Sequence, residues 1–380
     1  MQINAAVLNA SGVEAPYTET KPLTIEKLEL DSPGPGEVLV RIKAAGLCHS
    51  DLSVINGNRP RPLPMALGHE AAGIIEEVGP SEGMVGGDDL KPGDHVIFVF
   101  VPSCGHCEPC TEGRPALCEP GAAANGAGTL LSGERRLHRA DGTAVNHHLG
   151  VSGFADYAVV SRRSVVKIDQ ELPLIEAALF GCAVLTGVGA VINTARISAG
   201  SSAAVIGLGG VGLAALMGAM AAGARTVVAI DMAQDKLDFA RELGATVTVD
   251  ARDPDAAEQV KSATGGGVEY AFDLTGAVAA LDLAYKITRR GGTTVTAGLP
   301  APTATLSLAP VTLVAEERTL KGSYIGTAVP SRDIPRYIQL YRRGMLPVDK
   351  LLTGTLALDQ INEGFESLHA GQAIRQVIEW

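Results

Sequence analysis

Residues 203–212 read AAVIGLGGVG, a short apolar strand pattern followed at once by a glycine-rich turn. The glycines have the spacing G-x-G-x-x-G, and the apolar, small-residue stretch at 213–223 is typical of a helix. Such a turn lets the backbone approach a pyrophosphate, whose charge is stabilised by the helix N-terminus. The stretch therefore predicts the first strand, turn and helix of a dinucleotide-binding unit.

Further apolar strand patterns follow in regular alternation with helical spacers such as 232–244. They lie at 226–231, 245–249, 268–273, 293–298 and 319–326. Six strands in this alternation predict an α/β fold with a doubly wound parallel sheet. The uncharged run 203–224 is also long enough to cross a bilayer, but its glycines break it into strand, turn and helix, so we expect no membrane span.

Asp231 stands at the end of the second predicted strand, where it can select the nucleotide. A carboxylate there accepts hydrogen bonds from ribose hydroxyls. A 2′-phosphate would meet a like charge, with a repulsion on the order of 4 kcal/mol at contact distance for an effective dielectric of about 20. The residue therefore favours NAD over NADP, unless it only begins the next turn.

Length and charge limit the remaining possibilities. A chain of 380 residues is long enough for two domains. The 31 basic against 42 acidic residues give a formal net charge of −11, which argues against nucleic acids or anionic membranes as partners. The first twenty residues lack a basic start followed by an apolar run, so we expect a cytoplasmic protein.

Four of the six cysteines lie within residues 104–118, CGHCEPCTEGRPALC. Their spacing is C-x2-C-x2-C-x7-C, in which thiolates on a turning loop converge on one tetrahedral ion and leave no open position. The alternatives are a redox loop or an ordinary cysteine-rich turn. The pattern predicts a structural zinc bound by Cys104, Cys107, Cys110 and Cys118, which would stabilise a lobe with little apolar material.

The two other cysteines stand in GLCHSD (46–51) and FGCAVLTG (180–187), and GHEAAG (68–73) contains a histidine. Each alone is weak evidence, because a single cysteine in an apolar segment is usually a small buried hydrophobe. Together Cys48, His69 and Cys182 supply a Cys2His set, which is a known catalytic zinc shell with an open fourth position.

These motifs, together with GLGGVG and the final IRQVIEW, resemble in order and spacing the zinc-dependent medium-chain alcohol dehydrogenases over essentially the whole chain. The presence of 119–150 resembles the long, dimeric branch related to class III, glutathione-dependent formaldehyde dehydrogenases. The resemblance implies a β-rich, GroES-like catalytic domain at 1–183 and 325–380 that carries the zinc lobe. It further implies a Rossmann-type NAD-binding domain at 184–324, an active site in the cleft between the domains, and a homodimer.

The resemblance also implies roles for individual residues. Cys48, His69 and Cys182 would bind the catalytic zinc, and Ser50 would take the alcohol proton. Asp51 and Glu70 would be carboxylates around the zinc, with Asp51 orienting His69. The cofactor would contact His49, Thr186, Gly207, Gly209, Gly210, Val211, Gly212, Asp231, Lys236 and Arg375. The substrate pocket would include Ser50, Arg59, Phe100, His148 and Leu149.

We therefore expect a reversible NAD-linked oxidation of a primary, aromatic or secondary alcohol, in which zinc lowers the pKa of the alcohol and hydride passes to the nicotinamide. The alternatives are a formaldehyde-adduct or polyol dehydrogenase, a zinc-free quinone reductase and a non-catalytic NAD- and zinc-binding regulator. The surviving Cys2His set argues against the last two.

Three positions depart from the family pattern. Ser53 replaces a histidine that often passes the proton to solvent, so the proton route beyond Ser50 is open. His148 replaces an aromatic or aliphatic residue, and His147 with His148 can equally be a loop pair. The loop EPGAAANGAG (119–128) lacks the basic residue expected to bind the carboxylate of glutathione, which lowers the formaldehyde-linked alternative.

Overall fold

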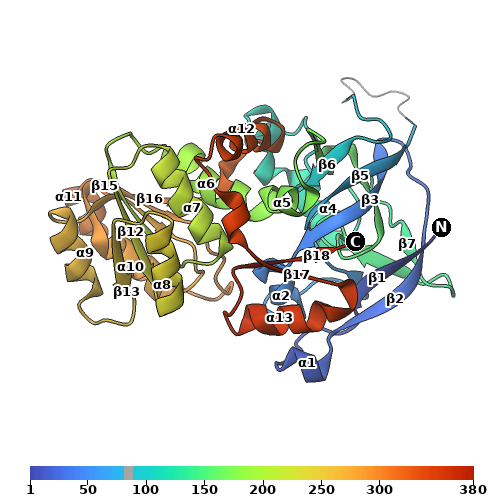
Figure 1. Ribbon diagram of the computed structural model, residues 1–380, viewed down its shortest axis with the longest axis horizontal. Coiled ribbons are helices and arrows are strands. Elements are labelled where there is room, and N and C mark those ends of the chain that lie inside the picture. The colour runs from blue at the N-terminus through green and yellow to red at the C-terminus, as the bar shows by residue number, and fades with distance from the viewer. Residues whose placement is uncertain (81–88) are drawn as a thin grey trace. The chain divides into compact units, whose positions relative to one another are not determined.

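The computed structural model describes residues 1–80 and 89–380, which form two compact units (Figure 1). Unit 1 comprises Met1–Cys182, Val329–Pro335 and Asp349–Trp380. Unit 2 comprises Ala183–Ala328 and Arg336–Val348.

Unit 2 contains a six-stranded sheet whose strands are all parallel. In spatial order they are β13 (Val247–Asp250), β12 (Thr226–Asp231), β11 (Ser202–Ile206), β14 (Val268–Asp273), β15 (Thr288–Thr296) and β16 (Thr319–Gly322). Numbered along the chain, this is the order 3-2-1-4-5-6 of a doubly wound dinucleotide-binding sheet, so the predicted fold class is confirmed. The central strand β11 is buried throughout, as expected for a parallel strand covered on both faces.

The helices of unit 2 precede, separate and follow these strands along the chain. They are α6 (Leu185–Gly189), η4 (Ala190–Ala195), α7 (Gly210–Ala221), α8 (Gln234–Glu242), α9 (Ala256–Thr264), α10 (Val278–Ile287), α11 (Pro310–Ala315) and η5 (Ile325–Thr327). Helix α12 (Pro330–Arg342) begins in unit 1 and ends in unit 2. The sequence expectation placed all of 325–380 with the catalytic domain. In the structure, Arg336–Val348 groups with unit 2, where the Tyr337 hydroxyl accepts a hydrogen bond from Asn193 Nδ2 at 3.3 Å.

Unit 1 combines a small closed barrel with a seven-stranded sheet. The barrel order is β1 (Gln2–Leu8), β2 (Leu23–Leu30), β7 (Leu137–His138), β8 (Ala144–His147) and β4 (Met65–Ala66). The sheet order is β10 (Val165–Ile168), β6 (His95–Phe98), β5 (Glu70–Val78), β3 (Glu37–Gly46), β18 (Arg375–Glu379) and β17 (Leu352–Leu356), with β9 (Tyr157–Ser161) also paired to β3. Its helices are α1 (Tyr17–Thr20), α2 (His49–Ile55), α3 (Glu108–Thr111), η1 (Pro115–Leu117), α4 (Glu119–Ala127), η2 (Arg162–Ser164), α5 (Leu174–Ala178), η7 (Leu358–Gln360) and α13 (Ile361–His369). Two short helices, η3 (Phe180–Val184) and η6 (Val348–Leu351), contain residues of both units.

The C-terminal strand β18 is an inner strand of the unit 1 sheet, between β3 and the edge strand β17. Strand β18 pairs antiparallel with β3, which is more than three hundred residues earlier in the chain. The indole nitrogen of Trp380 then donates to Asp156 Oδ1 at 3.1 Å, while the other carboxylate oxygen of Asp156 accepts from Asn4. Asp156 therefore joins residues near the two ends of the chain, Asn4 and Trp380, within unit 1.

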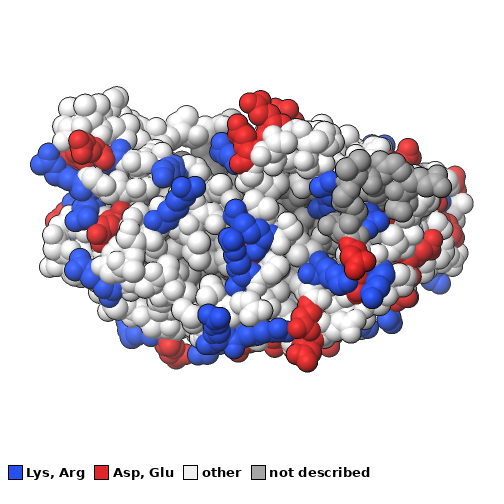
Figure 2. All heavy atoms as spheres, turned by 90° about the horizontal axis from the view of Figure 1, so that it is seen from above, with Lys and Arg blue, Asp and Glu red and all other residues white. Residues whose placement is uncertain are grey.

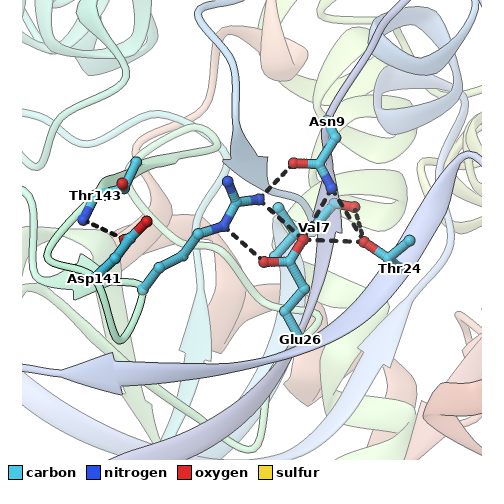
Figure 3. A network of polar contacts seen from close by, with 7 residues as sticks. Val7, Asn9, Thr24, Glu26, Asp141 and Thr143 are labelled. Atoms are coloured by element: carbon cyan, nitrogen blue, oxygen red, sulfur yellow. Dashed lines mark hydrogen bonds and ion pairs between the residues drawn. The ribbon is translucent and has the colours of Figure 1, made fainter.

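A polar network ties the turn between β7 and β8 to the first two strands of the barrel (Figure 3). Arg139 Nε donates to Glu26 Oε2 at 2.9 Å, and its Nη2 donates to both Glu26 and Asn9. Burial raises the pKa of Glu26, but hydrogen bonds from Arg139 and Asn9 outweigh this and lower it. The network holds the barrel end that precedes β8 and residue 148.

A long apolar helical segment and the distribution of surface charge are two further features of the chain. Residues Leu174–Ala195 are long and apolar enough to cross a membrane by length and composition, but 83% of the window that meets this test is buried inside the protein, as in a core helix. Figure 2 shows basic and acidic side chains scattered over one face of the molecule, with neither sign covering it.

Candidate active site

His69 lies between two strands of unit 1, and its position depends on the preceding glycine. Gly68 has a φ of +93°, a conformation that favours glycine, and a Cβ there would lie 2.4 Å from the backbone nitrogen of Phe154. The tight turn between β4 and β5 therefore directs His69 and Glu70 into a fully buried region. Both side chains must find polar partners or a metal there.

The two cysteines reach the same region from different elements. Cys48 is the N-cap residue of α2, at the end of the buried strand β3. Cys182 lies in η3, a π-helical turn of the kind often found at functional sites. A Cβ at Gly181 would lie 2.1 Å from the carbonyl oxygen of Phe98, so a glycine is needed for η3 to pack this closely on β6.

The structure brings Cys48, His69, Glu70 and Cys182 together, with their ligand atoms all within 4.8 Å of one another and all four residues buried. A hydrogen bond with Cys182 lowers the pKa of the Cys48 thiol well below its usual value, and the same bond with burial raises the pKa of Cys182. Neither buried ring nitrogen of His69 makes a hydrogen bond that meets geometric criteria among the described residues, and Nδ1 lies 3.1 Å from Asp51 Oδ2. Two sulfur ligands and one imidazole nitrogen in this arrangement fit a zinc ion with an open position.

Asp51 lies behind His69 and is fully buried. Its Oδ2 is 3.1 Å from His69 Nδ1, and its Oδ1 accepts from the backbone nitrogen of Gly68 at 3.0 Å. Burial raises the pKa of Asp51, but His69 and His148 together lower it below its ordinary value. Burial lowers the pKa of His69, but Asp51 and Cys48 raise it well above the ordinary value. With Nδ1 held by Asp51, Nε2 is the ring nitrogen left for a metal.

Arg375 and Glu70 form a second buried contact beside the thiols. Arg375 Nη1 donates to the carbonyl of Leu47 at 3.0 Å and lies 3.6 Å from Glu70 Oε2. Burial raises the pKa of Glu70 to about 7, even though the charge of Arg375 opposes this. The resemblance suggested Arg375 for a pyrophosphate contact, whereas its burial next to Glu70 has no signal in the sequence.

The expected substrate-pocket residues occupy different surroundings. Phe100 lies edge-on to the His69 ring, with centroids 4.8 Å apart. His148 is buried, and its Nδ1 lies 3.0 Å from Asp51 Oδ1. Leu149 is buried with a φ of +53°, which is unusual for a residue other than glycine. Arg59 is half-buried, and its backbone nitrogen donates to the carbonyl of Ser53.

Helix α2 carries the residues that follow Cys48. Ser50 is half-buried in its first turn, and His49 is exposed. Ser53 donates its hydroxyl to the carbonyl of His49 at 2.8 Å, so its proton is used within the helix. At position 53, where many family members carry a histidine that passes the proton on, Ser53 instead makes a local hydrogen bond within the helix.

The four-cysteine lobe has the geometry of a metal knuckle. The sulfur atoms of Cys104, Cys107, Cys110 and Cys118 all lie within 4.8 Å of one another. The backbone nitrogen of Cys107 donates to the Cys104 sulfur at 3.3 Å. The Cys118 sulfur accepts from the backbone nitrogens of Cys104 at 3.2 Å and Gly121 at 3.3 Å. Burial and the adjacent Cys107 and Cys118 raise the pKa of Cys110 to about 12. A divalent cation would remove this repulsion, so the residues fit the predicted structural zinc.

The glycine turn of unit 2 is shaped for close approach. Gly207 has a φ of +89°, and a Cβ at Gly212 would lie 1.7 Å from the carbonyl oxygen of Gly207. A Cβ at Gly209 would meet no atom within 4 Å, so open space faces this position. Asp231 accepts from the nitrogen of Leu208 at 2.6 Å, which brings the carboxylate to the turn. This open, glycine-lined turn beside a carboxylate fits a dinucleotide.

Four further predicted cofactor residues lie near this turn in chain or space. Gly210 and Val211 begin α7, whose N-terminus follows the turn. Thr186 is buried in α6 and precedes Gly187, where a Cβ would lie 2.2 Å from the Val211 carbonyl oxygen. Lys236 is half-buried in the first turn of α8, the helix that follows Asp231 along the chain.

Comparisons with known proteins agree with this geometry. Residues 34–170 match the family model described as alcohol dehydrogenase GroES-like domain, and residues 210–343 match that described as zinc-binding dehydrogenase. The S-(hydroxymethyl)glutathione dehydrogenase of Paracoccus denitrificans is 38% identical over 367 residues, covering 94% of this chain and 96% of that protein. The NDMA-dependent alcohol dehydrogenase of Amycolatopsis methanolica is 39% identical over 381 residues, covering 100% of this chain and 99% of that protein.

A solved structure gives the same result. The crystal structure of benzyl alcohol dehydrogenase from Acinetobacter calcoaceticus has a TM-score of 0.91 with this chain at 32% identity, covering 100% of this chain and 99% of that chain. Relatives of this identity and coverage, together with the two family models, confirm the resemblance drawn from the motifs. The chain belongs to the zinc-dependent medium-chain alcohol dehydrogenase family.

Proposed function

We propose that this zinc alcohol dehydrogenase uses NAD as its hydride acceptor and that Cys48, His69 and Cys182 bind the catalytic zinc. The observation that carries the proposal is the convergence of these three buried ligands within 4.8 Å, in a chain whose second unit carries the glycine turn and Asp231. Bound there, zinc would supply a Lewis acid that lowers the pKa of a substrate hydroxyl. A small-molecule alcohol is the substrate class that this chemistry serves.

The chain's own residues have separate tasks in this proposal. Asp51 holds the Nδ1 proton of His69 and so fixes which nitrogen faces the metal. Ser50, two residues after Cys48 and half-buried in the same helix turn, would accept the alcohol proton through its hydroxyl. Residue 53 is a serine whose hydroxyl donates to the His49 carbonyl. The proton would therefore leave Ser50 by a route that does not use a histidine at position 53.

The test is a metal count combined with a turnover screen. We expect two zinc ions per chain and NADH formation from a primary aliphatic or aromatic alcohol. Aliphatic alcohols, benzyl alcohol and the hydroxymethyl adduct of glutathione would be compared side by side, each with and without NDMA. One zinc ion and no turnover with any alcohol would favour a non-catalytic NAD- and zinc-binding regulator instead.

A second candidate activity is oxidation of a formaldehyde adduct, favoured by the name of the Paracoccus relative. The α4 segment Glu119–Ala127 carries no basic residue that could bind a glutathione carboxylate, which favours simple alcohols. The NDMA-dependent relative raises a further alternative, in which turnover requires NDMA in place of free NAD. The screen separates these outcomes directly.

Asp231 should control the choice of nucleotide. Replacing it by asparagine keeps an acceptor oxygen for Leu208 but removes the charge that would repel a 2′-phosphate. At about 4 kcal/mol for a contact pair, the NAD over NADP preference should fall by up to about 10³-fold. Steady-state kinetics with both nucleotides would measure it. Asp235→Asn, an exposed acid in the first turn of α8, serves as the control, and an unchanged ratio in Asp231→Asn would contradict this role.

We also propose a homodimer joined through the edge strand of unit 2. Strand β16 ends the sheet, and Val314 and Val311 of the adjacent α11 are 80% and 66% exposed. We expect Val314→Asp to shift the solution mass towards that of one 39.2 kDa chain, because a charge would be buried in the interface. Light scattering after gel filtration measures this mass. Met345→Asp, at another exposed apolar position, should leave it unchanged, and a dimeric Val314→Asp would count against this edge.

A further inference from the structure

Asp51 has contacts on both carboxylate oxygens, although only one is needed to orient His69. Oδ2 faces His69 Nδ1 at 3.1 Å, and Oδ1 faces His148 Nδ1 at 3.0 Å. The backbone nitrogen of Gly68 also donates to Oδ1 at 3.0 Å. Asp51 is therefore held by two histidines that are far apart in the sequence.

From this arrangement we propose that His148 is a positioning residue of the zinc centre, which holds the Asp51 carboxylate so that Asp51 holds the His69 ring. This inference rests on the proposed role of His69 as a zinc ligand. It assigns His148 a different task from the substrate-pocket wall implied by the resemblance.

The first support is the burial of the whole array. Asp51 and His69 have no exposed side-chain area, and the side chain of His148 is 2% exposed. A carboxylate buried to this extent is costly unless its oxygens are paired, so each contact contributes to keeping Asp51 ionised in one orientation. The His69 and His148 rings also meet edge to face, with centroids 5.6 Å apart.

The second support is the fixed backbone around His148. Its nitrogen donates to the Ala66 carbonyl and to Ser152 Oγ, both at 3.3 Å. The next two residues, Leu149 and Gly150, have φ values of +53° and +67°, which turn the chain back immediately after His148. Strand β8 pairs in parallel with β4 through Ala66 and His147. His148 follows β8 directly and His69 follows β4, so the same strand pair positions both histidines. The His148 side chain is therefore delivered to Asp51 by rigid structure.

Two other roles for His148 make different predictions. A substrate-binding residue would change KM for the alcohol while leaving the metal unaffected. A metal ligand would create an additional ion among Asp51, His69 and His148, whose ligand atoms lie within 4.8 Å of one another. The positioning role is favoured because Nδ1 of His148 already faces a carboxylate oxygen at hydrogen-bonding distance.

Three variants of the holoenzyme test the proposal. His148→Phe keeps a planar ring but removes the donor, and His148→Asn places an amide nitrogen near the position of Nδ1. His147→Gln is the control, because His147 is equally buried but its ring faces Arg136 and Ser152. The readouts are the transfer of the catalytic zinc to a chelator and the visible spectrum of the cobalt-substituted protein.

We expect His148→Phe to weaken retention of one zinc ion by about 10- to 100-fold and to shift the cobalt bands, as the loss of a carboxylate–histidine support does. His148→Asn should restore most of this retention, and His147→Gln should match the original protein. Unchanged retention in His148→Phe, a change in KM alone, or three metal ions per chain in the original protein would each overturn the proposal. If His148→Phe is recovered unfolded, His148→Leu against His148→Asn carries the same comparison.

Failure of this inference is distinguishable from failure of the proposed function. If the unaltered protein holds two zinc ions and oxidises alcohols while His148→Phe retains its metal, only the positioning role is wrong. If the unaltered protein holds a single zinc ion and oxidises no alcohol, the catalytic site itself is wrong.

Discussion

Replacing Cys182 by alanine should lower alcohol turnover by at least about 10³-fold and reduce the zinc content from two ions per chain to one. The thiol is buried, and its sulfur lies within 4.8 Å of the ligand atoms of Cys48 and His69. Removing one of three ligands dismantles the site, and a bound metal contributes several kcal/mol to charge stabilisation at about 1.4 kcal/mol per tenfold in rate. Turnover of an alcohol and zinc measured on the same sample provide the check.

Val184→Ala is a matched control for this variant. Val184 is buried in the same π-helical turn and offers no metal ligand, so it reports the cost of disturbing the packing of η3 alone. It should keep both zinc ions and most of the turnover. A Cys182→Ala protein that retained two zinc ions and near-normal turnover would show that the metal lies elsewhere.

The fold of unit 2 was readable in the sequence because strands such as β11 and β12 are short apolar runs that end at Gly207 or Asp231. The predicted strands at 226–231 and 268–273 coincide with β12 and β14. The strand predicted at 319–326 stops at 322, because Ile325, Gly326 and Thr327 have positive φ values that no strand can contain. Local turn geometry of this kind leaves only a weak mark on apolar patterning.

The candidate metal ligands could be grouped from the sequence for a different reason. Cysteine clusters and a Cys2His set have few uses other than metal binding, so residue type and spacing suffice to group them. The six cysteines are free and fall into the two predicted groups. Residues without such restricted chemistry, such as Glu70 beside Arg375, could be grouped only by the fold.

The contact between Asp51 and His148 could not be predicted from the sequence. The histidine pair at 147 and 148 was visible, but a substrate wall and a plain loop pair were equally compatible with it. The side chain to which His148 points is set by the register of β8 on β4 and by the turn at Leu149, and both depend on long-range pairing. The sequence carries no local signal for either.

Loss of the structural zinc should have the second largest effect, and here the expected result is unfolding. We expect Cys110→Ser to lose one zinc ion, to lower the thermal midpoint and to open the lobe around residues 104–118 to proteases. Most side chains between Gly105 and Leu117 are exposed or half-buried, so little apolar burial is available to hold this lobe. A structural zinc contributes on the order of 10 kcal/mol to such a lobe, which is comparable to the stability of a whole domain.

The control and the location of cleavage make this expectation specific. Glu112→Ala changes an exposed residue of the same lobe and should leave both the zinc content and the cleavage pattern unchanged. Mass analysis of the first proteolytic fragments should place cleavage of Cys110→Ser within 104–118 and not in unit 2. If Cys110→Ser kept two zinc ions and resisted proteolysis, the four sulfurs would be packing without a metal. The backbone N–H groups directed at Cys104 and Cys118 argue against this, because they stabilise thiolates, and thiolates packed this closely need a cation.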